Sequence, residues 1–334
     1  MGNARHQKIS IYLITFLLIG TVFLTTASGD ESNKAVLYSG NTLYVGGSGK
    51  GNYSSIQSAI DDASDGDTVF VYAGVYNENI RISTQIQLIG LEKEKTIISS
   101  SNSSEFLILD SVDFTIIENL MFICNNDEQF DLIKMINCNY CTISNVDIIS
   151  ETLQRSAIKL NGFFNTVENI TTRGRYLFAG VELFHGGDNT IKNNSFESCS
   201  EGILIHQSHN NLISSNEMTN NTNAIYIEEG NNNFITRNIL KSNIRGIFSS
   251  YSTGNLIEKN DFLDNGEHVR FLKLLKIGFL LPNTWRNNYW DDYKGFLRKP
   301  ILGVLYIPNR NLFGWFFPWF EFDKCPSTEP LNIS

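Results

Sequence analysis

Apolar and polar positions repeat every 22 residues in the second half of the chain. Each of four copies starts with an asparagine and carries an isoleucine two positions later. These residues are Asn189, Asn211, Asn233 and Asn255, and Ile191, Ile213, Ile235 and Ile257. About eight columns keep their register over the four copies, which predicts one structural unit repeated along the chain.

Within each copy, apolar residues alternate with polar ones over two short stretches that are separated by turns. Alternation with a period of two predicts strands that bury one face. A unit this short cannot bury its apolar face alone, so successive units must stack. The pattern predicts an all-β fold, a single-stranded right-handed parallel β-helix with coils of about 22 residues. The isoleucines would form an internal ladder. The asparagines would occupy bends, where Asn tolerates left-handed backbone angles and its amide can reach the next coil.

Upstream of residue 189 the copies persist with longer spacing. Ile143 and Val167 continue the first isoleucine column at intervals of 24 residues, and Ile158 and Val181 precede Ile203 in a second column. Since the strands keep register, the additional residues must bulge from turns, and we expect the bulges at residues 151–156 and 172–178. Irregular loops on one face of a solenoid are where binding residues usually lie.

Both ends of the chain carry segments that would cap an open stack of strands. Residues 29–66 are predicted to contain a first strand and a capping helix, because Ile56, Ala59, Ile60 and Ala63 form one apolar stripe. Residues 67–281 would form the β-helix, and residues 282–334 an aromatic-rich C-terminal cap. That tail has two interpretations, a hydrophobic lid over the last coil or a surface that contacts sugars or a membrane.

The N-terminus has the pattern of a secretory signal. A weakly basic start precedes an uncharged apolar run at residues 9–24, which is followed by small residues up to position 28. The run is short for a membrane-spanning helix of about 20 residues. Residues 1–28 are therefore predicted to be a signal peptide, with an uncleaved N-terminal anchor as the alternative. Either way, the body of the protein would be secreted to the cell surface or a periplasmic-type space.

Charge and cysteine usage narrow the possible partners. The chain has 334 residues and a formal net charge of -9, whereas nucleic-acid-binding proteins are usually basic, so no nucleic-acid partner is expected. Five cysteines occur, an odd number that leaves at least one unpaired. Six Asn-x-Ser/Thr sequences are weak candidates for glycosylation, at Asn52, Asn102, Asn169, Asn193, Asn220 and Asn332.

Several segments resemble a known family. Residues 55–63 (SIQSAIDDA), 66–69 (GDTV) and 86–90 (IQLIG) are similar to the opening of pectin-lyase-like β-helix proteins. Together with the Asn-x-Ile repeats and residues 288–293 (NYWDDY), they most closely resemble NosD-like β-helix proteins over about residues 40–295. The resemblance implies the fold and leaves the function open, since members include lyases, hydrolases, epimerases, copper-site accessory proteins and non-catalytic surface proteins.

Carboxylates that would cleave a polysaccharide do not form a column in the sequence. Glycoside hydrolysis needs two carboxylates on one face, and lyase chemistry needs a base with acidic groups that hold Ca²⁺. Acids 22 to 25 residues apart are few, and we expect Asp131, Asp147 and Glu182 to be solvated. Asp291 and Asp292, beside Trp290 and Tyr293, are weak catalytic or cation-binding candidates; the alternative is that they cap backbone amides.

Metal ligands are equally sparse. His185, His206 and His209 are weak candidates for copper, which favours imidazole and sulfur. Alternation places His206 opposite Ile205 and therefore outward. The single CxxC of Cys138 and Cys141 lacks the second pair that zinc usually needs, so buried thiols are the simpler interpretation. No cofactor is predicted, although copper or Ca²⁺ stays open.

Three functions remain, and the question of catalysis is left open with a preference for none. The first is an exported, non-catalytic envelope β-helix that binds a glycan or another surface protein. The second is a polysaccharide lyase or hydrolase that uses carboxylates from the bulged loops. The third is a copper-handling accessory protein. The repeating columns are Ile, Asn and Gly, which build a stack and carry no chemistry.

Overall fold

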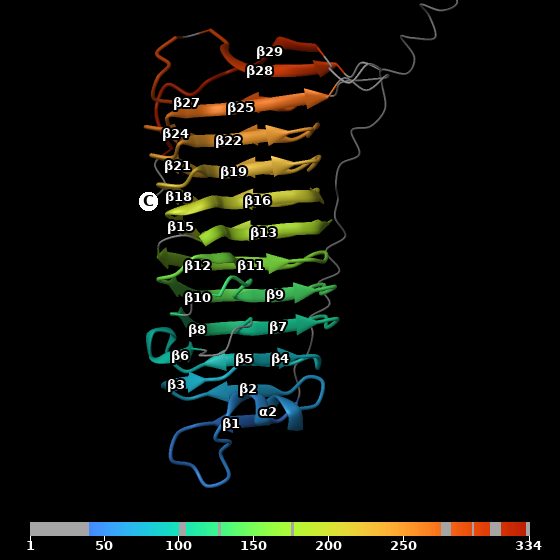
Figure 1. Ribbon diagram of the computed structural model, residues 1–334, viewed down its shortest axis with the longest axis vertical. Coiled ribbons are helices and arrows are strands. Elements are labelled where there is room, and N and C mark those ends of the chain that lie inside the picture. Colours follow the sequence, from blue (N-terminus) through green and yellow to red (C-terminus); the bar gives the residue numbers. More distant parts are fainter. Residues whose placement is uncertain are drawn as a thin grey trace, which may run out of the picture. The chain divides into compact units, whose positions relative to one another are not determined.

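A computed structural model describes residues 40–99, 105–125, 128–174, 177–274, 282–295, 297–307 and 315–331. In these residues the chain forms a parallel β-solenoid of about ten coils with very little helix (Figure 1), which confirms the predicted fold class. The predicted signal segment, residues 1–28, lies outside the described residues, so its cleavage stays a prediction. Within the described residues, no helix is long and apolar enough to span a membrane.

Each regular coil contributes one strand to each of three parallel ladders. The first ladder contains β1 (Thr42–Val45), β2 (Thr68–Val71), β5 (Gln87–Gly90), β8 (Ile116–Cys124), β10 (Thr142–Ser150), β12 (Thr166–Gly174), β14 (Thr190–Lys192), β17 (Leu212–Ser214), β20 (Phe234–Thr236), β23 (Leu256–Glu258) and β26 (Thr284–Arg286). The second contains β3 (Gly74–Asn77), β6 (Thr96–Ser99), the second halves of β8, β10 and β12, then β15 (Ser195–Glu197), β18 (Glu217–Thr219), β21 (Ile239–Lys241), β24 (Asp261–Leu263) and β27 (Tyr289–Trp290).

The third ladder has the longest strands in the middle of the stack and forms the front of Figure 1. It contains β4 (Ile80–Ile82), β7 (Leu107–Asp110), β9 (Ile133–Ile136), β11 (Gln154–Leu160), β13 (Leu177–Gly187), β16 (Cys199–His209), β19 (Asn223–Glu228), β22 (Arg245–Ser250), β25 (Glu267–Leu274) and β28 (Lys299–Ile307). Strand β29 (Trp315–Asp323) returns antiparallel to β28. A single helical turn, η1, covers Lys93–Lys95.

The core consists of apolar columns that run the length of the stack. Ile143, Val167 and Ile191 pair in register, and the column continues through the repeat isoleucines to Trp285. Every member is at most 1% exposed. Stacked equivalent positions lie about 4.8 Å apart, so each branched side chain packs on its own kind in the next coil. The predicted registers are confirmed upstream too, where Ile158 pairs with Val181 and Ile133.

The additional upstream residues bulge where the sequence predicts. Strand β10 ends at Ser150 and β11 begins at Gln154, while β12 ends at Gly174 and β13 begins at Leu177. The turns between the second and third ladders therefore absorb the longer spacing. Strand pairing on either side of each turn is unaffected.

Buried asparagine ladders hold the turns of successive coils together. In one ladder the side-chain oxygen of Asn238 accepts hydrogen bonds from the backbone N–H of Asn216 (2.9 Å) and from its amide nitrogen (3.0 Å), and Asn260 does the same for Asn238. The repeat asparagines form a second such ladder, which includes Asn189 and Asn211. The prediction that amides bond along the stack is confirmed.

The predicted backbone conformation of these asparagines is wrong by one residue. The left-handed angles belong to the preceding residues, such as Asn210 (φ 58°), Asn232 (φ 58°) and Arg237 (φ 57°). An exposed left-handed residue turns the chain, and the asparagine that follows points inward. There its amide satisfies backbone groups that burial would otherwise leave unpaired.

Both ends of the stack are covered. At the N-terminal end, α2 (Ile56–Asp62) buries Ile56, Ala59 and Ile60, with Ser55 accepting the N-cap hydrogen bond from Ser58. At the C-terminal end, Trp285 and Trp290 are 1% exposed. Carboxylates of β29 lie at the ends of the two long asparagine ladders.

The asparagine ladders end on two buried carboxylates of β29. Asp323 accepts hydrogen bonds from the backbone and side-chain nitrogens of Asn288 (3.1 and 3.0 Å) and from Trp290 Nε1 (3.1 Å). Glu321 accepts from the backbone N–H of Asn283 (3.1 Å) and from Trp285 Nε1 (2.6 Å). Strand β29 therefore serves partly as the predicted lid over the last coil.

Candidate functional site

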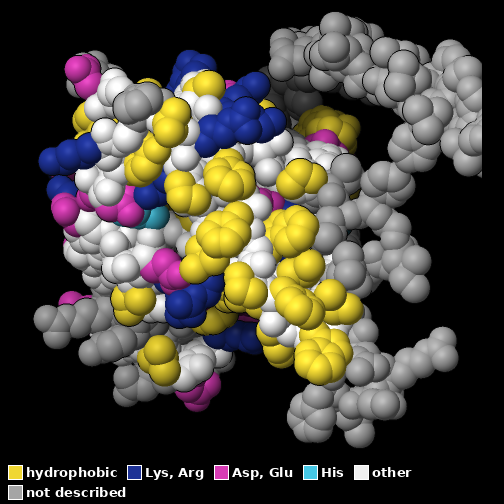
Figure 2. Space-filling view, turned by 90° about the horizontal axis from the view of Figure 1, so that it is seen from above, with side chains coloured by type: hydrophobic (Ala, Val, Ile, Leu, Met, Phe, Trp, Pro, Cys, Tyr) yellow, Lys and Arg dark blue, Asp and Glu magenta, His cyan; other side chains and the backbone are white. Residues whose placement is uncertain are grey.

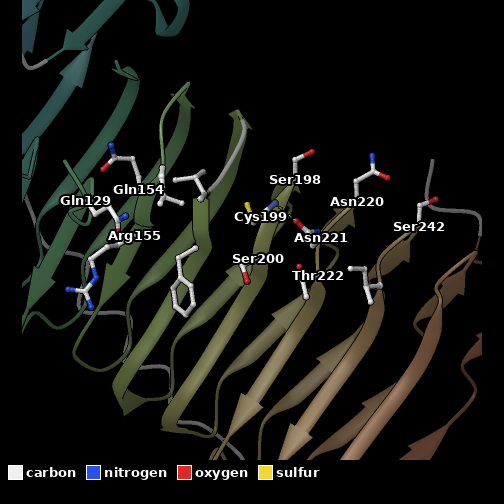
Figure 3. A pocket seen from close by; sticks show the side chains of 14 residues that line it. Gln129, Gln154, Arg155, Ser198, Cys199, Ser200, Asn220, Asn221, Thr222 and Ser242 are labelled. Atoms are coloured by element: carbon white, nitrogen blue, oxygen red, sulfur yellow. Dashed lines mark hydrogen bonds between the residues drawn. The ribbon is translucent and has the colours of Figure 1, made fainter. Parts of the chain in front are cut away.

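A groove of about 780 Å³ crosses five coils beside the third ladder. It follows the turns that lead into β11, β13, β16, β19 and β22, the part of the molecule in which the bulged loops lie (Figure 3). Its 14 lining residues include Leu153 and Phe178 from the predicted bulges. The groove therefore lies beside the bulged loops, where the sequence led us to look for binding residues.

Three parallel columns of side chains build the groove (Figure 3). The outer column is Ser198, Asn220 and Ser242, each exposed and left-handed, with φ between 55° and 61°. The inner column, from β11 to the turn before β22, is Arg155, Phe178, Ser200, Thr222 and Ile244. Between them, Leu177, Cys199 and Asn221 are buried and form the floor. The same positions recur on each coil, so the groove offers a repeated set of hydroxyl and amide groups.

The charge and polarity of the groove favour a neutral or anionic ligand. Arg155, which is exposed, is the one charged side chain among the described lining residues. Gln129 and Asn220 contribute amides, while Phe178 (45% exposed) and Ile244 (62%) provide apolar surface. Hydroxyls, amides and an exposed aromatic ring together suit a polyhydroxylated ligand.

Glu201 lies directly behind the groove. Its side chain is 6% exposed, and it contacts Asn223 Nδ2 at 2.8 Å and Ser200 Oγ at 3.3 Å. Burial raises the pKa of this carboxyl to about 7. Ser200 therefore links the groove wall to a carboxyl that changes protonation near neutral pH. Sequence analysis missed this residue because its neighbours on adjacent coils are Ala179 and Asn223, so no acidic column marks it.

The prediction that Asp131, Asp147 and Glu182 are solvated is wrong, since they are 4%, 7% and 8% exposed. Asp147 pairs with Lys93 at 2.9 Å, and Glu182 pairs with Lys159 at 2.8 Å. Paired burial of this kind is how proteins retain internal charges.

A hydrogen-bonded chain links two of these carboxylates through Ser156. Glu182 accepts from Ser156 Oγ at 2.6 Å, and Asp131 accepts from the Ser156 backbone N–H at 3.2 Å. Burial raises the pKa of Asp131, while the Ser156 N–H opposes that change. Ser156 follows the groove residue Arg155, but neither carboxylate lines the groove.

The three histidines proposed as metal ligands do not converge. His206 is half-buried and lies on the outer face as predicted, where it pairs with Glu228 at 2.7 Å and stacks on Phe184. The ring of His185 is 5.8 Å from that of His206. His209 Nδ1 already accepts the backbone N–H of Asn231 at 3.1 Å. These imidazoles do not form a ligand set for copper, which needs converging nitrogen or sulfur atoms.

Asp291 and Asp292 lie in a second hollow, of about 400 Å³, together with His268. His268 Nε2 is 2.8 Å from Asp291 and 3.4 Å from Asp292, and Lys299 is 2.6 Å from Asp292. Among described residues, His268, Asp291 and Asp292 are the one group of His, Cys, Asp or Glu side chains close enough to share a cation. The ammonium of Lys299 already neutralises Asp292, and Asp291 also accepts the backbone N–H of Asp264. This arrangement fits an ion-pair network better than a copper site, which favours softer ligands.

The cysteines are unpaired. Cys124, Cys138, Cys141 and Cys199 are buried and Cys325 is exposed. Cys138 and Cys141 are the buried thiols expected from their sequence. A hydrogen bond between them lowers the pKa of Cys138 and raises that of Cys141. Burial raises the pKa of Cys199 to about 12, so this thiol in the groove floor stays protonated and unreactive.

Solved structures with the same architecture act on polysaccharides or bind sugars. The A-module of mannuronan C-5 epimerase AlgE4 from Azotobacter vinelandii is 13% identical, with a TM-score of 0.51 over 70% of this chain and 82% of that one. An exopolygalacturonase from Thermotoga maritima is 10% identical, with a TM-score of 0.54 over 81% and 90%. XylC, solved with xylose, is 12% identical, with a TM-score of 0.57 over 72% and 69%. At these identities the likeness establishes the pectin-lyase-like right-handed parallel β-helix fold and no more.

Sequence comparison assigns the family. No curated protein sequence matches this chain. The family model described as periplasmic copper-binding protein (NosD) matches residues 60–295. That range covers most of the chain, from within the N-terminal helix α2 to just past the Asp291–Asp292 pair. The chain therefore belongs to the NosD family of β-helix proteins.

Proposed function

We propose that this protein is an exported, non-catalytic β-helix that binds an extended acidic glycan along the groove. The observation that carries the proposal is the repetition of the lining: hydroxyl and amide groups recur on successive coils about 4.8 Å apart. A polymer laid parallel to the stack would meet similar side chains at each coil. Arg155 would pair with a sugar carboxylate, and Phe178 would pack against a ring.

Several observations favour binding over cleavage. No described carboxylate lines the groove, and the nearest buried acids are engaged in hydrogen bonds with Ser156, Lys159 or Asn223. Hydrolysis requires two carboxyl groups that reach the scissile bond from opposite sides. Sugar-processing neighbours such as the alginate lyases and polygalacturonases suggest uronic-acid polymers as ligands to test.

Copper handling, which the family description names, has weaker support from these residues. His206 and His209 use their Nδ1 atoms within the fold, and the His268 cluster contains a lysine. The N-terminal signal pattern and the family description as periplasmic both support export as part of the proposal.

The test is calorimetric titration of the full chain with oligomannuronate, oligogalacturonate and a neutral cello-oligosaccharide. We expect the acidic oligomers to bind, and Arg155→Gln to weaken binding by about 10- to 100-fold, as expected for loss of a hydrogen bond to a charged group. Arg237→Gln is the matched control, because Arg237 is also exposed but lies on the opposite turn, between β20 and β21. Equal effects of the two substitutions, or no binding of any oligomer, would refute the groove as the site. Release of unsaturated or reducing ends would refute the non-catalytic assignment.

A further inference from the structure

The hairpin of β28 and β29 exposes a large apolar surface at the C-terminal end of the stack. Strand pairing brings Leu302 beside Phe320 and Tyr306 beside Phe316 on its outer face. Leu302, Phe316 and Phe320 are 58%, 66% and 52% exposed. Figure 2, a view onto this end, shows hydrophobic side chains gathered with lysines and arginines beside them. Contiguous apolar surfaces of this kind mark interaction sites.

Strand β29 is exposed on both of its faces. Trp315–Phe320 forms an unbroken run of six exposed residues, and neighbouring side chains in a strand point to opposite sides. Trp315 and Trp319 therefore project from one face while Phe316 and Phe320 project from the other. Strand β28, by contrast, buries Ile301 and Leu305 against the stack. A docked protein would cover one face of such a strand, whereas a lipid interface can surround both.

Exposed cations lie beside the hairpin, and the exposed carboxylate of Asp292 next to it is paired with Lys299 at 2.6 Å. Both acidic residues of β28 and β29, Glu321 and Asp323, are buried and at most 4% exposed. Arg298 and Lys324 are exposed and lie side by side, because Lys299 pairs with Asp323. A chain of net charge -9 thus presents exposed cations beside the aromatic surface of the hairpin, which favours an anionic partner there.

We propose that this hairpin is a peripheral membrane contact that inserts its aromatic side chains among the headgroups of an anionic lipid surface. Trp and Phe partition to the boundary between headgroups and acyl chains. Basic side chains beside them gain attraction from anionic lipids. The contact is separate from the groove, so it neither requires nor implies the glycan function.

Tryptophan fluorescence gives a local test with the full chain. All four tryptophans lie in the last 50 residues; Trp285 and Trp290 are buried, while Trp315 and Trp319 are 63% and 36% exposed. With vesicles of equal phosphatidylglycerol and phosphatidylcholine, we expect a blue shift of the emission and quenching by brominated acyl chains. Because the N-terminal segment contains no tryptophan, membrane binding through that segment alone would not produce this quenching.

Variants separate the contributions. Phe320→Ser should weaken vesicle binding by about tenfold or more, because the variant lacks a Phe side chain that the lipid interface would bury. Arg298→Gln should weaken binding by about fivefold, on anionic vesicles only. Phe163→Ser is the control, since Phe163 is 48% exposed but lies far along the stack, next to β12. Unquenched tryptophans in vesicle-bound protein would overturn the proposal. So would equal binding to pure phosphatidylcholine, or a stable dimer that Phe320→Ser dissociates without any quenching in the wild type.

Discussion

Replacement of Asn238 by alanine is expected to destabilise the solenoid by about 3–5 kcal/mol. Asn238 is fully buried, and its side chain accepts from the backbone and amide nitrogens of Asn216 and donates to Ile213 O at 2.9 Å and to Asn260 Oδ1 at 2.9 Å. Alanine leaves two Asn216 donors without this acceptor inside the stack. Each buried donor left unpaired costs about 1–3 kcal/mol, and the carbonyl of Ile213 loses a donor as well.

Equilibrium denaturation in urea, followed by circular dichroism, measures this loss directly. Asn232→Gly is the matched control, because Asn232 is exposed and already has a positive φ of 58° that glycine adopts freely. We expect that variant to lie within about 0.5 kcal/mol of wild type.

The double variant Asn216→Ala/Asn238→Ala tests whether the ladder acts as a unit. Asn238→Ala leaves the side-chain donor of Asn216 unpaired, and Asn216→Ala removes that donor. The double change should therefore cost less than the sum of the single changes. Strict additivity of the two changes would refute coupling between the ladder amides. A loss of unfolding free energy for Asn238→Ala no larger than that for Asn232→Gly would refute the stabilising role of the ladder.

Two further changes probe the third ladder. Burial raises the pKa of Glu201 from 4.5 to about 7, so the folded chain binds this proton more tightly than the unfolded chain. The protonated Glu201 therefore contributes its full stabilisation below about pH 4.5, and the unfolding free energy falls by about 3 kcal/mol as the pH rises to 7. Glu201→Gln should remove this pH dependence of the unfolding free energy. An unchanged pH profile in that variant would contradict the raised pKa of Glu201. Gly180→Ala should destabilise by about 1–3 kcal/mol in thermal unfolding, because a Cβ there would lie 2.6 Å from Phe196 and 2.7 Å from the carbonyl oxygen of Gly202; a melting temperature equal to wild type would show that the coil can widen at this position.

The strand register could be predicted from the sequence because the repeat itself encodes it. Ile191, Ile213 and Ile235 are equivalent by spacing, and each coil must place them one above another to bury them. The position of the bulges followed from the same argument, since Ile158 and Val181 keep their pairing despite longer spacing. Fold and register thus follow from periodicity.

Charge burial could not be predicted in this way. Asp147 is neutralised by Lys93, 54 residues earlier and outside the regular repeat. Glu182 is neutralised by Lys159 and accepts a hydrogen bond from Ser156. Alternation indicates which face of a strand a residue occupies, but not whether neighbouring long side chains cover it. The groove could not be predicted either, because Ser198 and Asn220 look like ordinary turn residues in the sequence and line a groove only when the coils are stacked.

The asparagine ladders give the stack an electrostatic direction. In the ladder of Asn216, Asn238 and Asn260, each amide points its oxygen toward the preceding coil and an N–H toward the following one. The aligned amide dipoles add, much as peptide dipoles do in an α-helix, so the positive end of each column lies at the last coil. Asp323 receives the final amide N–H of this ladder, from Asn288 Nδ2 at 3.0 Å, in the role that acidic residues have at a helix N-terminus. The last coil therefore presents the positive end of this ladder, and a carboxylate of the cap strand meets it from within the same chain.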